Sequence, residues 1–127
     1  MTATPTDWIE HRRAGDRELL GWLRLEDDGA VAIDRLGRTA SGVLPWDEAE
    51  AVLDERGIGW LADLWELELD GRPVRVRLRE VSTERVVVTY DDHGDVHTKV
   101  DAIELPFPAP ATLRPFGGDR HVLDPLR

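Results

Sequence analysis

The densest group of potential metal ligands in this sequence of 127 residues lies around Gly94. It comprises Asp91, Asp92, His93, Asp95 and His97. Imidazole and carboxylate groups together suit zinc or another divalent ion. However, a glycine between charged residues is typical of an exposed hairpin turn, and no third histidine stands nearby to complete a tetrahedral site. We therefore expect no metal ion at this turn, and no cofactor elsewhere in the chain.

Nucleophilic and nucleotide chemistry has little support in the residue pattern. The chain contains no cysteine, which excludes thiol catalysis and disulfides. Ser41 and Ser82 are its only serines, and neither stands in a Gly-x-Ser-x-Gly sequence. Residues 57–62 formally match a dinucleotide-binding fingerprint, but they follow a predicted helix where that motif requires a strand. An enzyme would need a site that only the fold assembles, which is the third functional hypothesis.

Three arginines alternate with apolar residues along one predicted strand, which places them on a single face of a sheet. They are Arg75, Arg77 and Arg79. Such a row could contact phosphates, so the second functional hypothesis is a nucleic-acid-associated small β-barrel. The competing interpretation is that the row faces Glu66 and Glu68 across a hairpin. Base stacking also requires exposed aromatic rings, and Tyr90 is the only tyrosine.

The charge balance favours a protein partner over nucleic acid or a membrane surface. The chain has 26 acidic and 16 basic residues, for a net charge of −10, which repels phosphate backbones and anionic lipids at long range. No stretch approaches the roughly 20 apolar residues of a membrane span, and the first residues lack the pattern of a signal peptide. These features predict a cytoplasmic protein without membrane contact, and they leave its oligomeric state open.

Five acids cluster on the most clearly signalled helix, which we predict over residues 48–56 with Asp47 as its N-cap. Gly57 follows at the position where many helices end in a residue of positive φ. The apolar stripe of this helix consists of Ala49, Val52 and Leu53. The acids are Asp47, Glu48, Glu50, Asp54 and Glu55. This acidic face either binds a basic partner or only keeps the protein soluble.

The tryptophan content supplies a candidate anchor for such a contact. The chain has five tryptophans, and the indole ring buries a large area while it keeps one polar group. Trp22 alternates with Leu23 and Leu25, so it is either a contact residue or part of a second core layer. The leading hypothesis is a small non-enzymatic protein-binding or adaptor domain whose partner is a protein with a basic surface. The predicted contact residues are Trp22, Glu48, Asp54 and Glu55.

Alternation of apolar and polar residues predicts an α+β fold, mostly antiparallel β with one short helix. A three-residue loop over residues 27–29 would pair Leu25 with Val31. In a second hairpin, Leu67 should pair with Val76 and share its sheet face. Residues 65–104 could form a small SH3-like barrel.

We expect a single globular domain over residues 1–105, with possible subdomains at 1–60 and 61–105. Prolines then stand at positions 106, 108, 110 and 115, which forbids a continuous helix or a central strand. Residues 106–127 are therefore predicted as an extended Pro-rich tail, either laid over the domain or loose.

Several segments resemble those of a family of small proteins from high-GC bacteria. These segments are Trp8-Ile9-Glu10-His11-Arg12-Arg13, Gly21-Trp22-Leu23, Asp34-Arg35-Leu36-Gly37-Arg38, Gly57-Ile58-Gly59-Trp60-Leu61 and Leu105-Pro106-Phe107-Pro108-Ala109-Pro110. The resemblance would cover most of the sequence and implies a complete chain. The family carries no assigned activity, so the resemblance implies no functional residue.

Overall fold

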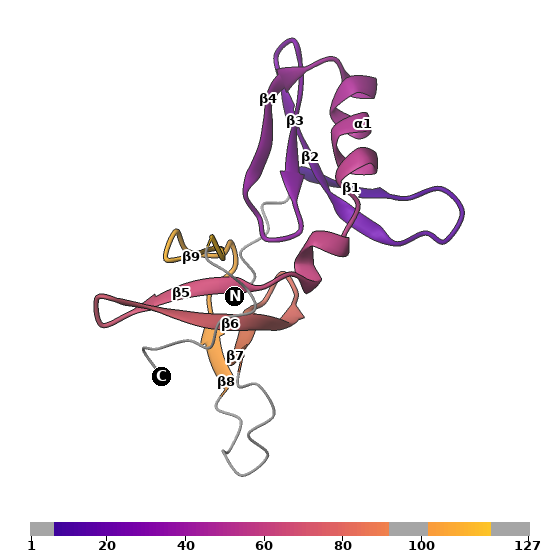
Figure 1. Cartoon of the computed structure of the whole chain (residues 1–127). Helices are drawn as coiled ribbons and strands as arrows, with labels where there is room; N and C mark the ends of the chain where they lie inside the picture. The colour runs from indigo at the N-terminus through magenta and orange to yellow at the C-terminus, as the bar shows by residue number, and fades with distance from the viewer. Residues whose placement is uncertain (1–6, 92–101, 118–127) are drawn as a thin grey trace.

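The computed structural model describes residues 7–91 and 102–117, which form two antiparallel sheets and one α-helix (Figure 1). The first sheet has the order β1-β2-β3-β4, from β1 (Trp8–Arg12), β2 (Leu19–Glu26), β3 (Gly29–Asp34) and β4 (Thr39–Leu44). Next come α1 (Trp46–Arg56) and a short 3-10 helix, η1 (Gly59–Ala62). The second sheet has the order β8-β7-β6-β5-β9, from β5 (Trp65–Leu69), β6 (Arg72–Val81), β7 (Val86–Tyr90), β8 (Ala102–Leu105) and β9 (Leu113–Pro115). The predicted α+β class is confirmed.

Helix α1 lies on one face of the first sheet, where small side chains let it approach β3 (Figure 1). Ala30 and Ala32 of β3 and Ala49 of α1 are fully buried, together with Leu23 and Leu53. Alanine has no side-chain atom beyond Cβ, so the helix backbone rests close to the sheet and excludes water from the interface. Among the described residues, no helix has the length and apolarity of a membrane span.

The start of α1 differs from the prediction. The helix begins at Trp46, and its N-cap is Pro45, without a side-chain capping bond, so the predicted capping by Asp47 is wrong. The Pro45 carbonyl already accepts the N–H of Glu48 at 3.0 Å. Proline is also well tolerated at the N-cap, because the N–H that it lacks would have no hydrogen-bond partner within the helix. Gly57, at φ 63°, ends the helix as predicted.

The β2–β3 hairpin turns through two residues, Asp27 and Asp28, and not through the predicted three. Leu25 consequently pairs with Ala30 and not with Val31. The apolar pattern could not select this register, because every residue of β3 from Ala30 onward is buried. A strand that is buried on both faces satisfies either register, and the turn geometry decides between them.

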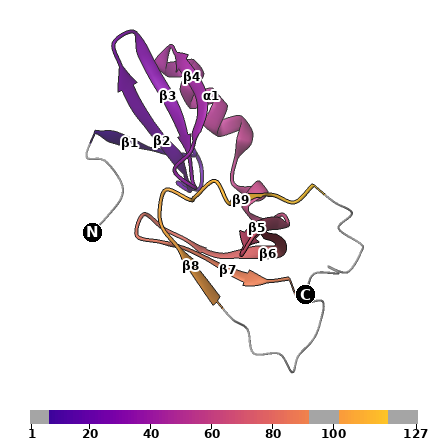
Figure 2. The ribbon, with the colours of Figure 1, turned by 90° about the vertical axis from the view of Figure 1, so that its left-hand side faces the viewer.

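The second sheet lies at one end of the first sheet (Figure 2), and there the side chains of the face opposite α1 join those of the second sheet in one shared core. Trp22 is 2% exposed, and its ring centroid lies 5.8 Å from that of Trp8 and 5.5 Å from that of Phe107. Trp65 enters the same core from β5. Trp22 therefore belongs to a second core layer, and its prediction as an exposed contact residue is wrong.

The β5–β6 hairpin keeps the predicted faces but not the predicted register. Trp65 pairs with Val76 and Leu67 pairs with Val74, which shortens the loop to Asp70 and Gly71. These two turn residues have φ values of 51° and 79°. An Asp-Gly pair with two positive φ angles suits a tight hairpin whose twist matches that of the strands. The tight turn thus outweighs the additional apolar pair that the longer loop would have provided.

The segment after Leu105 belongs to the fold. β9 pairs with β5 at the edge of the second sheet, and Phe107, Ala109 and Leu113 are buried in the shared core. Arg38 donates hydrogen bonds to the carbonyl groups of Pro110 and Leu113. The predicted domain boundary at residue 105 therefore falls inside the structure. β8 and β9 stand at opposite edges and do not pair with each other, so the described strands do not close the predicted SH3-like barrel.

Candidate functional site

The five acids of α1 divide into two groups. Glu50 and Asp54 bind His11 of β1, with Oε2 of Glu50 3.4 Å from Nδ1 and Oδ1 of Asp54 2.9 Å from Nε2. The other three are exposed and form no ion pair with any described residue, namely Asp47, Glu48 and Glu55. Two of the predicted contact acids thus remain available to a partner, whereas Asp54 is engaged with β1.

His11 ties the edge strand β1 to the helix. Its side chain is only 12% exposed, and each ring nitrogen faces a carboxylate. The two acids stand one helical turn apart, a spacing visible in the sequence. The position of His11 beneath them depends on its pairing with Gly21 of β2, which the sequence did not indicate.

Replacing His11 by phenylalanine is expected to lower the free energy of unfolding by about 1–3 kcal/mol, because the hydrogen bond to Asp54 and the contact with Glu50 are lost. The effect should concentrate in β1, whose amide hydrogens should exchange faster than those of β3. Residue-resolved hydrogen exchange measures this difference. The variant Glu55→Gln changes an unpaired acid of the same helix and should leave β1 exchange unaltered. Unchanged exchange of β1 in the His11 variant would contradict the role of the histidine.

Three large apolar side chains are exposed around the β1 side of α1. Ile9 is 41% exposed, Leu25 is 56% exposed and Trp46 is 39% exposed. Ile9 pairs with Leu23 and Leu25 pairs with Ala30, and both partners pack beneath α1, so the two side chains share the helix-bearing face. Trp46 is the first residue of α1, one turn before Glu50 and two turns before Asp54, which bind β1. These residues form the apolar strip, which consists of Ile9, Leu25 and Trp46.

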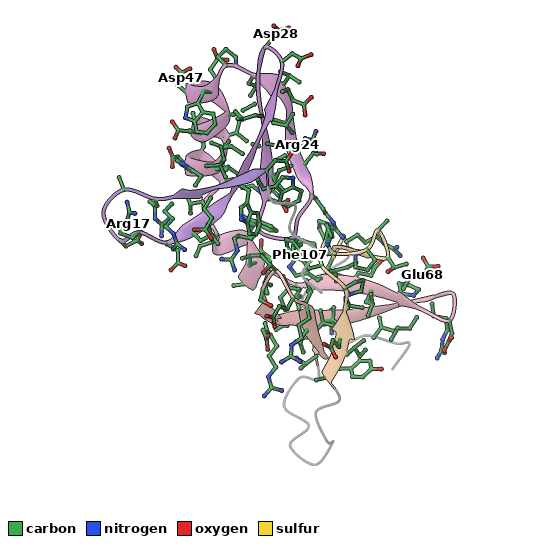
Figure 3. The ribbon with its side chains drawn as sticks, turned by 180° about the vertical axis from the view of Figure 1, so that it is seen from behind. Arg17, Arg24, Asp28, Asp47, Glu68 and Phe107 are labelled. Atoms are coloured by element: carbon green, nitrogen blue, oxygen red, sulfur yellow. The ribbon has the colours of Figure 1, made fainter. Side chains whose placement is uncertain are left out.

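Exposed carboxylates lie at the end of the molecule where α1 begins. Figure 3 shows Asp28 of the β2–β3 turn and Asp47 of α1 at this same end. Together with their sequence neighbours they form the acidic end, which consists of Asp27, Asp28, Asp47 and Glu48. None of the four forms an ion pair with a described residue, and the nearby Arg24 is held by Glu26 at 2.9 Å. The acidic end therefore presents uncompensated negative charge next to the apolar strip.

The predicted arginine row does not form a continuous exposed surface. Arg75 is 2% exposed, and its Nε lies 3.1 Å from Asp91 Oδ2. Arg77 reaches the same carboxylate at 3.2 Å, and of the three only Arg79 is exposed without a carboxylate partner among the described residues. Arg75 pairs across the hairpin with Glu66, but that acid is bound by Arg114 of β9 at 2.8 Å. The three arginines do not form one exposed row, because Asp91, which follows β7, binds Arg75 and Arg77.

The described residues contain no assembled catalytic group of the kinds tested from the sequence. Ser41 accepts a hydrogen bond from the Ala32 N–H and donates to the Gly42 carbonyl. Ser82 accepts hydrogen bonds within the turn that joins β6 to β7. Within the described ranges, no group of three histidine or acidic side chains is arranged to hold a metal ion. The predicted turn that carries His93 and His97 lies outside these ranges.

Comparison of the chain with protein-family models, with curated proteins and with solved structures yields no match.

Proposed function

We propose that the protein is a non-enzymatic binding domain whose partner is another protein. The observation that carries the proposal is that three of the four large exposed apolar side chains of the described residues form the apolar strip, beside the acidic end. Large apolar groups that remain exposed together often mark an interaction surface. The partner would combine an apolar anchor with flanking Lys or Arg side chains.

The two parts of this surface have different physical roles. Tryptophan is enriched among the residues that dominate binding free energy, so Trp46 takes the anchoring role that the sequence had assigned to Trp22. The carboxylates of the acidic end accelerate the approach of a basic partner and discriminate against acidic ones. The fourth exposed apolar side chain, Val43, lies on the other face of the sheet, opposite Val31. It therefore offers an internal control.

No second function is proposed. The nucleic-acid hypothesis depended on three exposed arginines on one strand, and Arg75 is buried against Asp91. The acidic end would also repel a phosphate backbone.

The proposal is tested by capturing partners from a native lysate with the full chain and with variants, followed by affinity measurements on the purified partner. Trp46→Ser and Leu25→Ser should each weaken binding by about tenfold or more, because each removes buried apolar area. Val43→Ser removes an equally exposed apolar side chain from the opposite face and should leave the affinity unchanged. A partner that binds both strip variants as tightly as the native chain would contradict the proposal.

Charge reversal tests the acidic end on the same partner. Asp47→Arg together with Glu48→Arg should slow association strongly at low ionic strength and much less at high ionic strength, because salt screens the interaction. Glu84→Arg places a new positive charge on the exposed turn between β6 and β7 and serves as the matched control. If the double reversal left the association rate at low salt unchanged, the acidic end would serve only to keep the protein soluble.

A further inference from the structure

The outer face of the second sheet, opposite the shared core, is covered by arginine–carboxylate pairs with one exception. Arg114 binds Glu66 and Glu68, and Arg85 binds Glu80 and Glu104. Arg75 and Arg77 share Asp91. Among the described arginines of this face, Arg79 alone has no carboxylate partner. Within the described ranges no hydrogen bond or ion pair occupies its guanidinium, so the donors can serve a ligand.

A β-bulge sets the position of Arg79. Leu78 pairs with Val88 and Glu80 pairs with Val87, so Arg79 is the additional residue on β6. A bulge changes the direction of the side chain it carries, and bulges are frequent beside functional sites. Arg79 therefore has no cross-strand partner on β7, unlike its neighbours Leu78 and Glu80.

Arg79 lines a surface cavity of about 350 Å³. The other lining residues are Glu80, Arg85, Val87, Ala102 and Glu104. A cavity of this size accommodates a small organic group. Arg85 bridges two of its walls, with contacts of 3.1 Å to Glu80 and 3.4 Å to Glu104. The walls are therefore held by ion pairs, and Arg79 lines the same cavity without a carboxylate partner among the described residues.

We propose that this cavity binds an organic monocarboxylate. The planar guanidinium of Arg79 matches the two oxygens of a carboxylate and can donate a pair of parallel hydrogen bonds. Val87 and Ala102 supply apolar surface for the carbon chain of the ligand. Glu80 and Glu104 repel multiply charged anions, so phosphate and polyphosphate are disfavoured. The same chemistry is presented by a free short-chain acid and by the C-terminal carboxylate of a peptide.

The proposal is independent of the apolar strip, and titration followed by amide NMR of the full chain tests it. Isovalerate should produce saturable shifts at Val87 and Ala102, whereas the neutral isovaleramide should not. Arg79→Gln should weaken isovalerate binding by about tenfold or more, because the charged hydrogen-bond donor is lost. Arg72→Gln changes another exposed arginine of β6 and should leave binding unchanged.

A second arm identifies the source of the carboxylate. N-acetyl-Ala-Val is compared with its C-terminal amide, and a tighter dissociation constant than that of isovalerate assigns the cavity to peptide termini. Equal or weaker binding assigns it to free acids, and either result supports the carboxylate site. Absence of saturable shifts with both acids, equal binding of the amides, full retention of binding in Arg79→Gln, or tighter binding of inorganic phosphate would each overturn the proposal.

Discussion

Replacing Trp22 by alanine is expected to lower the free energy of unfolding by about 3–5 kcal/mol. The ring is 2% exposed and contacts the rings of Trp8 and Phe107, so its removal leaves a cavity where the two sheets meet. The surrounding strands belong to different sheets and can close such a cavity only in part. Chemical denaturation with a fluorescence or circular-dichroism readout measures the loss.

The matched control for this prediction is Trp46→Ala. Trp46 is 39% exposed at the first residue of α1, and substitutions at such positions change stability by about 1 kcal/mol or less. The two variants therefore separate the stability role from the binding role of tryptophan. If Trp22→Ala left stability intact and abolished partner binding, the original interpretation of Trp22 as the contact residue would be restored.

Replacing Phe107 and Leu113 together by alanine is expected to remove roughly 5–8 kcal/mol, a loss comparable to the whole stability of a small domain. Both side chains are buried in the core that the two sheets share. Phe107 also contacts Trp22 of the first sheet, and Leu113 pairs with Leu67 of the second. We therefore expect the double variant to lose its cooperative unfolding transition, as measured by thermal melting.

Exposed residues of the same segment supply the control for the double variant. Pro106→Ala combined with Thr112→Ala changes two exposed positions and leaves the buried side chains in place. This control should melt within a few degrees of the native protein, because surface changes of this kind cost little. If the double Phe107 and Leu113 variant melted like this control, residues 106–117 would not be needed for the stability of the fold.

The architecture explains how such a small chain can expose an apolar strip and remain folded. Residues from both sheets and from the segment after Leu105 build the shared core. The helix-bearing face of the first sheet takes no part in that core, because its buried residues form a separate cluster beneath α1. Helix α1 packs mainly over β3 and β4 on that face, and it contacts β1 through Glu50 and Asp54, which bind His11. His11 then holds β1 at the margin of this surface, which positions Ile9.

Local pattern predicted the helix and most side-chain faces, but it did not predict η1 or β9. The helix was predicted from a capping residue, an apolar stripe and a terminal glycine, and the acids Glu48 and Glu55 lie exposed on it as expected. Leu67 and Val76 share a buried face, as alternation predicts. These features depend on residues within a few positions of each other, and helical and strand periodicities report them directly.

Only the tertiary structure decided which side chains on each face of a strand became buried. The sequence allowed Trp22 to face solvent or a second core layer, and the ring of Phe107, 85 residues later, packs against it in the shared core. The sequence predicted Arg75 as an exposed member of a row, but in the structure it is buried against Asp91 and the ring of Phe116. In both cases the deciding partner is distant in the sequence. Periodicity specifies that a strand has two faces, but only long-range packing determines what covers each one.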